Sequence, residues 1–152
     1  MPTVSKTINR ILVATDFAEN AELVLDQAVV MARAFDATLD IVHVREVFAY
    51  ALTGGFVPSP QQHEVLIDWI DEALVRLRDR AVRAGVPCVT CSLDGSPASA
   101  IVQHAVKTGA QLVVMGTHGR TGIAHAVLGS VAERVVHKAR CPVMVIPTHA
   151  AA

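Results

Sequence analysis

The chain has 152 residues, of which 52% are hydrophobic and 18% are charged, and this composition excludes a disordered chain. The length is typical of one domain with a substantial apolar core. A formal net charge of −1 provides no basic surface for a polyanion. We therefore expect neither nucleic acid nor an acidic membrane surface as a partner.

The N-terminal region resembles neither a secretory signal nor a membrane segment. Residues 1–6 are mostly polar, and the apolar run Ile11–Ala14 is too short for either role. The three cysteines, an odd number, are expected to be reduced thiols. These features predict a cytoplasmic protein.

Short apolar runs alternate with helical spacing in the first half of the chain. Strands are predicted at Ile8–Thr15 and Leu39–Val44. Residues 46–60 contain Gly54–Gly55 and two prolines, which predicts an irregular, variable connection. One helical stripe consists of Ala21, Val24, Leu25, Ala28, Ala32 and Phe35, and a second consists of Leu66, Ile70, Ala73, Leu74, Leu77 and Ala81.

The second half of the chain continues the alternation. After the turn at residues 94–97, Ala98, Ile101, Val102 and Ala105 mark a helix that Gly109 closes, and another helix is predicted at Val131–Lys138. The remaining strands are predicted at Cys88–Leu93, Gln111–Met115 and Pro142–Pro147. This order predicts one Rossmann-like α/β domain over residues 1–152, with a parallel sheet covered by helices on both faces. A disordered tail is expected at about residues 148–152.

The pair Cys88 and Cys91 has the spacing of some redox and zinc motifs. The pair lies within a predicted strand, where residues three apart face opposite sides. No second Cys or His pair at ligand spacing completes a zinc site. The sequence therefore favours neither a redox nor a metal role for these thiols.

The most informative stretch runs from Gly116 to Ser130 and joins a predicted strand to a predicted helix. Gly116, Gly119 and Gly122 allow sharp turns and a close approach of backbone N–H groups to an anion. Gly129 and Ser130 open the last helix, whose first N–H groups and dipole favour negative charge. The spacing is typical of a phosphate-binding loop.

Two residues near these junctions have a second interpretation as helix caps. Ser130 and Glu133 have the spacing of a capping box, which is compatible with phosphate binding because a serine hydroxyl both donates and accepts. Asp16 follows the first strand, at the end where ligands of such sheets bind, and could accept hydrogen bonds from a ribose or a base. With Glu19 three residues later, Asp16 is on spacing alone more readily explained as an N-cap.

Sequence signatures of several enzyme classes are absent. The chain has neither the glycine and lysine spacing of a P-loop nor a dinucleotide-binding fingerprint after its first strand. His118 and His125 lie in the glycine-rich stretch without an identifiable orienting partner, so surface positions explain them better than general-base catalysis. We therefore predict a binding protein rather than an enzyme, and a slow ATPase stays as the alternative.

Several motifs together resemble the universal stress protein family, specifically its ATP-binding branch. The resemblance covers essentially the whole chain, and the branch's signature of Gly-x-x-Gly, nine residues and Gly-Ser is intact at residues 116–130. Ala18 departs from the family, whose members often carry serine there. The other motifs are residues 11–17, 43–44, 95–97, 114–120, 129–130 and 141–143.

The resemblance implies a sheet of strand order 3-2-1-4-5, with ATP bound where the first and fourth strands diverge and Mg²⁺ accompanying its phosphates. Asp16 would meet the ribose or base, and the Val44 backbone would contact adenine. Gly119 and Arg120 would approach the phosphates. The complete set of implied nucleotide-binding residues is Ala14, Thr15, Asp16, Val44, Met115, Gly116, Gly119, Arg120, Gly129, Ser130 and Val131.

The same strand order makes Pro142–Pro147 an edge strand. Its residues Val143, Met144, Val145 and Ile146 would leave unpaired backbone beside apolar side chains, and natural proteins cover such edges. A homodimer through this edge is predicted, as the resemblance also implies. The expected role is a nucleotide-responsive regulatory or protective protein in the stress response, and the remaining alternative is a nucleotide-free dimeric scaffold.

Overall fold

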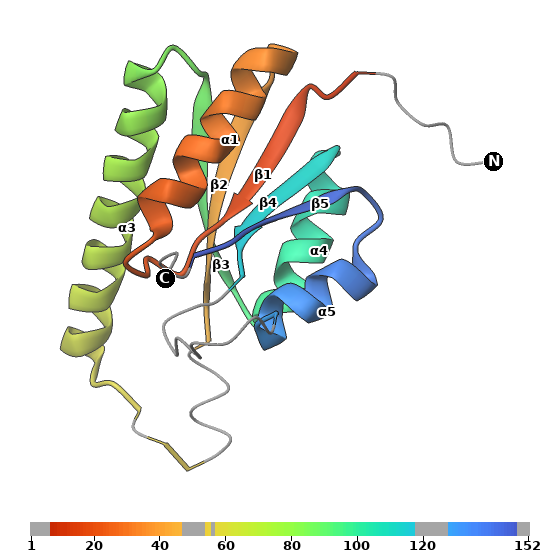
Figure 1. Cartoon of the computed structure of the whole chain (residues 1–152). Helices are drawn as coiled ribbons and strands as arrows, with labels where there is room; N and C mark the ends of the chain where they lie inside the picture. The colour runs from red at the N-terminus through yellow and green to blue at the C-terminus, as the bar shows by residue number, and fades with distance from the viewer. Residues whose placement is uncertain (1–6, 47–53, 56, 118–127, 149–152) are drawn as a thin grey trace.

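The structure, a computed structural model, describes residues 7–46, 54–55, 57–117 and 128–148. Most of the predicted connection at 46–60, and residues 149–152 of the predicted tail, lie outside this part of the chain. The elements are β1 (Arg10–Ala14), α1 (Ala21–Phe35), β2 (Thr38–Arg45), α3 (Pro60–Arg83), β3 (Cys88–Asp94), α4 (Pro97–Thr108), β4 (Leu112–Gly116), α5 (Ser130–Lys138) and β5 (Val143–Ile146) (Figure 1). The predicted alternation of strands and helices is confirmed.

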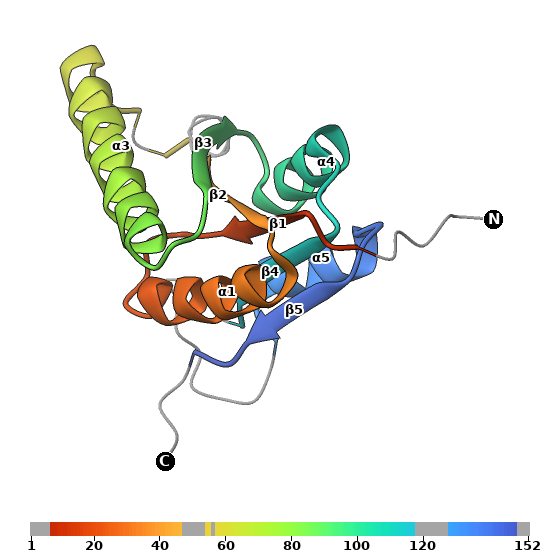
Figure 2. The same cartoon turned by 90° about the horizontal axis from the view of Figure 1, so that it is seen from above.

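The strands form one five-stranded sheet in the order β3-β2-β1-β4-β5, and every neighbouring pair is parallel. The predicted fold class and strand order are therefore confirmed. Helices α1 and α3 cover one face of the sheet, and α4 and α5 cover the other (Figure 2). The strand order reverses between β1 and β4, which are neighbours in the sheet. Strand β1 leads to α1 on one face, and β4 leads to α5 on the other.

The core has two layers because side chains of a strand alternate between the faces of the sheet. Ile11 packs in the cluster under α1 and α3, and its neighbour Leu12 packs in the cluster under α4 and α5; neither side chain is exposed. The same alternation separates the two strand cysteines. Cys88 packs against the first cluster and Cys91 against the second, which confirms that they face opposite sides of the sheet.

Two helical stripes differ from the prediction at their ends. Phe35 and Leu66 were expected in the core, but both are exposed. Helix α3 begins at Pro60, well before Leu66, because Ser59 and Gln62 form a capping box: Ser59 Oγ accepts from Gln62 N at 3.3 Å, and Gln62 Oε1 accepts from Ser59 N at 2.9 Å. In the described part of the chain, no helix is long and apolar enough to cross a membrane.

Candidate functional site

A cleft of about 650 Å³ opens at the carboxyl ends of the central strands. It lies where the strand order reverses, which is where open α/β sheets bind their ligands. The predicted site residues that the structure describes all line this cleft, namely Ala14, Thr15, Asp16, Val44, Met115, Gly116, Gly129, Ser130 and Val131. Gly119 and Arg120, together with Gly122, His118 and His125, lie outside the described residues.

Local hydrogen bonds shape the loop after β1. Thr15 N donates to Val42 O at 2.9 Å, and Thr15 Oγ1 accepts from Phe17 N at 3.1 Å. Asp16 Oδ1 accepts from Ala18 N at 3.0 Å, so the carboxylate stabilises a turn before the helix. The interpretation of Asp16 as an N-cap is wrong, because Asn20 is the N-cap residue of α1.

An aromatic cluster supports this loop from the α3 side. His43 Nδ1 lies 2.9 Å from Thr15 O, and because a carbonyl only accepts, Nδ1 carries the proton. The Phe17 ring lies 4.4 Å from the His43 ring and 5.4 Å from the Trp69 ring, measured between centroids. Phe17 has a φ of 59°, an uncommon backbone conformation that these contacts help to hold.

Trp69 was missed as a cleft residue, although it lies one turn after Leu66 and one turn before Ala73 on the predicted stripe. That spacing could have placed it on the same helix face. Its ring contact with Phe17 could not be predicted, because the two residues are distant along the chain.

The N-terminus of α5 forms the opposite wall of the cleft. Gly129 is the N-cap residue, with φ −61° and ψ 157°, and no side chain caps this helix. Glu133 N donates to Gly129 O at 2.9 Å, so the predicted capping box on Ser130 is wrong. The first N–H groups of α5 have no intrahelical acceptor, and they lie where Ser130 and Val131 line the cleft. Together with the helix dipole they favour an anion.

A group of hydrogen bonds joins β4 to the residues on either side of the cleft. Gly116 is the last residue of β4 and pairs with Ile146, so the turn expected at Gly116 is absent. Thr117 O accepts from Gly129 N at 2.7 Å, and Thr117 Oγ1 accepts from Thr148 N at 3.2 Å. Thr148 also lines the cleft and is buried, so its prediction as the start of a disordered tail is wrong.

A second polar cluster lies outside the cleft, between β1, β2 and α4. Asp40 is only 2% exposed, and its Oδ2 lies 3.0 Å from His104 Nε2 and 3.6 Å from an Arg10 guanidinium nitrogen. Its other oxygen, Oδ1, is buried and has no hydrogen-bond partner. This cluster was missed because His104 is 64 residues from Asp40 along the sequence. Among the described residues, no group of three or more His, Cys, Asp or Glu side chains could hold a metal ion.

Comparison with known proteins assigns the chain to a family. The universal stress protein family model matches residues 7–147. The chain belongs to the universal stress protein family. Universal stress protein MJ0531 of Methanocaldococcus jannaschii is 36% identical over 143 residues, 90% of this chain and 81% of that protein. Universal stress protein YxiE of Bacillus subtilis is 35% identical over 145 residues, 91% of this chain and 98% of that protein.

Solved structures of other universal stress proteins share the fold. One, in complex with cAMP, has a TM-score of 0.70 at 26% identity and covers 94% of this chain and 99% of its own. Another, from Archaeoglobus fulgidus in complex with dAMP, has a TM-score of 0.69 at 26% identity and covers 91% of this chain and 97% of its own. Both of these relatives were solved with adenine nucleotides.

Proposed function

We propose that this universal stress protein binds ATP in the cleft and acts as a nucleotide-responsive regulatory or protective protein. The observation that carries the proposal is the N-terminus of α5, which lines the cleft without a side-chain cap. The adenine nucleotides bound by two relatives of the same fold support this choice of ligand. ATP would supply a charged phosphate chain whose presence or absence changes the order and charge of this surface.

We infer that the lining residues hold an adenine nucleotide along its length. At one end Val44 and Met115 offer apolar contacts and backbone groups, and the Asp16 carboxylate would accept hydrogen bonds from the ribose. At the other end the N–H groups of Ser130 and Val131 would hold phosphate oxygens. Gly119 and Arg120, from outside the described residues, are proposed to complete the phosphate contacts.

Mg²⁺ is proposed to enter with the phosphates rather than on a protein site. The described side chains form no metal-binding cluster, and Mg²⁺ in nucleotide sites is commonly held by phosphate oxygens, water and one or two protein ligands. A binding role is favoured over hydrolysis because we assign the Asp16 carboxylate to the ribose and not to an attacking water. A slow ATPase would instead convert the bound ATP to ADP over time.

The first test identifies nucleotide released from freshly purified protein by mass spectrometry, followed by calorimetric titration with ATP. We expect an adenine nucleotide in the wild-type protein and little change in the ATP to ADP ratio during incubation. Asp16→Ala should weaken ATP binding about tenfold, as expected for loss of a charge-assisted hydrogen bond. The control Asp71→Ala removes an exposed carboxylate of α3 and should bind as the wild type does. Absence of both nucleotide and titration would overturn the ligand assignment.

We further propose that the protein is a homodimer through the open edge of β5. Val143, Met144, Val145 and Ile146 are half-buried, and β5 pairs only with β4 in the described sheet. Val113 N donates to Pro142 O and Thr117 N to Ile146 O, so even-numbered residues of β5 face β4. The backbone groups of Val143 and Val145 therefore point to the open edge.

This geometry provides a variant that blocks pairing at the edge and spares the sheet. Val145→Pro removes an outward N–H, which edge strands tolerate, whereas Val145→Thr keeps it. Sedimentation should give a dimer for the wild type and Val145→Thr and a monomer for Val145→Pro. A wild-type monomer at micromolar concentration would count against the dimer.

A further inference from the structure

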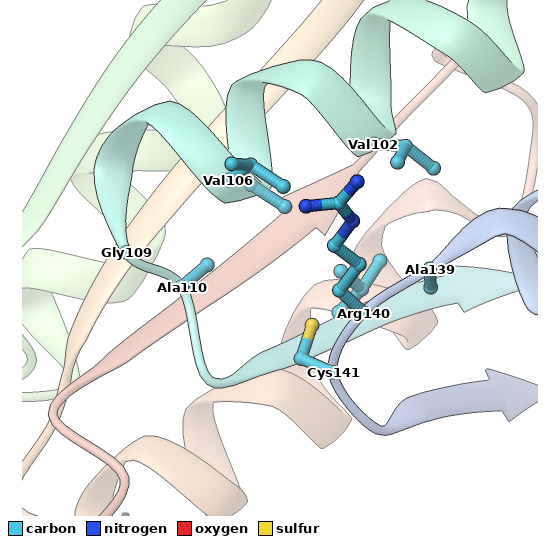
Figure 3. A pocket seen from close by; sticks show the side chains of 9 residues that line it. Val102, Val106, Gly109, Ala110, Ala139, Arg140 and Cys141 are labelled. Atoms are coloured by element: carbon cyan, nitrogen blue, oxygen red, sulfur yellow. The ribbon is translucent and has the colours of Figure 1, made fainter. Parts of the chain in front are cut away.

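A second hollow, of about 220 Å³, lies at the amino end of β4, on the face that α4 and α5 cover. It is bounded by the C-terminal half of α4 and by the turn from α5 to β5 (Figure 3). The nucleotide cleft lies at the other end of the same strand, and the two hollows share no lining residue. The second hollow is therefore a separate site, lined by different side chains.

The walls of this hollow are almost entirely apolar. Val102 and Val106 line it from α4, Ala110 lies at the turn into β4, and Val113 lies on the strand. Cys141 completes the wall, and burial raises the pKa of its thiol, so the group is neutral at physiological pH. An apolar cavity of about 150 Å³ is large enough to bind benzene, so this one accommodates a single ring.

One charged side chain lines the hollow. Arg140 extends from the turn after α5 toward Val102 and Val106 of α4 (Figure 3). Arg140 is exposed, and among the described residues no carboxylate forms an ion pair with it. A guanidinium presents a planar set of donors that matches a carboxylate. An apolar wall beside a cation of this kind is complementary to a small apolar anion.

We propose that this pocket binds a small monocarboxylate whose apolar body is about the size of one ring, with the ring against α4 and β4 and the carboxylate on Arg140. This pocket and the nucleotide cleft share no lining residue, and the proposal stands independently of ATP binding.

The test is a titration of the ¹⁵N-labelled full chain with benzoate, followed by NMR. We expect the amide signals of Ala110, Val113 and Cys141 to shift. Arg140→Gln should raise the dissociation constant for benzoate about threefold, because solvent screens the exposed guanidinium, and leave that for benzyl alcohol, its neutral counterpart, unchanged. The control Arg134→Gln removes an exposed arginine of α5 that lines neither hollow. Equal benzoate affinity in the two arginine variants would overturn the proposal.

A second pair of variants tests the location without altering charge. Val106→Trp fills the hollow from its rim, where the valine is 54% exposed, and should abolish the benzoate shifts. Val82→Trp makes the same change at a 52% exposed position of α3 and should leave the shifts intact. Both sites tolerate a larger side chain because they face solvent, and circular dichroism checks the fold. Shifts confined to the nucleotide cleft, or shifts that survive Val106→Trp, would contradict the assignment.

Discussion

The two ends of the sheet use polar groups in different ways. At the carboxyl ends the connections after β1 and β4 lead to helices on opposite faces, and the cleft between them is lined by polar groups such as Asp16 and the N-terminus of α5. Toward the amino ends, Asp40 is buried and already paired with His104. The difference teaches that this fold leaves polar groups along an open cleft where the strands diverge, which suits the proposed binding role, and buries a paired carboxylate where the layers close.

The largest expected effect comes from unpairing the buried carboxylate. His104→Leu leaves Asp40 without its closest partner, which should lower the free energy of unfolding by about 3 kcal/mol. Urea denaturation followed by circular dichroism measures this loss. His137→Leu, at an exposed position of α5, is the control and should change stability by less than about 0.5 kcal/mol.

The His104→Leu variant should lose stability without losing ATP affinity, which is measured at temperatures where the variant is folded. The double variant Asp40→Leu with His104→Leu should recover most of the lost stability, since apolar replacements of a buried pair are often neutral. If His104→Leu were as stable as His137→Leu, the Asp40–His104 pair would not stabilise the fold, and the proposed difference between the two ends of the sheet would be wrong.

A smaller loss is expected at the cleft. Thr117→Val keeps the side-chain shape and removes the hydroxyl that accepts from Thr148 N, which should cost about 1 kcal/mol. Thermal unfolding measures the change. Thr108→Val is the comparison at the other end of the sheet, where the hydroxyl donates only within its own helix, to His104 O. Its expected effect is less than about 0.5 kcal/mol, and a larger loss there than at Thr117 would contradict the role assigned to the Thr117 hydroxyl.

The smallest effect concerns the ion pair between α1 and α3. Arg80 donates to both Asp26 oxygens at 2.7 and 2.8 Å, and this hydrogen bonding with the arginine charge holds the pKa of Asp26 below its ordinary value of 3.8. Because the folded-state pKa is lowered, the pair stabilises the protein above pH 3.8, and this contribution is lost as the pH falls below that value. Both side chains are nearly half exposed, so solvent screening keeps this contribution to stability small.

Asp26→Asn tests this assignment through the pH dependence of unfolding. Above pH 3.8 the variant should have a slightly lower free energy of unfolding than the wild type, and this difference should disappear as the pH falls below 3.8. A deficit that stayed constant down to the most acidic condition would show that the carboxylate charge is not involved.

The fold was predictable because its signals are local and repeated. Buried parallel strands are continuous apolar runs, and Gly109 ends α4 in the left-handed conformation, with a φ of 70°. The start of α3 could also have been predicted, since Ser59 and Gln62 have the spacing of a capping box and Pro60 stands at the first helical position.

The details of the site were less predictable because they depend on competing or distant partners. Asp16 has the spacing of a cap, but its carboxylate instead accepts from Ala18 N two residues later. Ser130 likewise has the spacing of a cap, but Gly129 takes the N-cap position. The pairing of Asp40 with His104 and the position of Thr148 at the cleft arise only when distant segments pack together.

The central claim, that the N-terminus of α5 holds phosphate, is tested most directly by Ser130→Pro. Helices α3 and α4 already begin with Pro60 and Pro97, so proline at this position removes one N–H without breaking the helix. Ser130→Ala separates the hydroxyl from the N–H. We predict that Ser130→Pro weakens ATP binding about tenfold and leaves adenosine binding within about twofold of the wild type. Unchanged ATP binding, or equal losses for ATP and adenosine, would contradict the account.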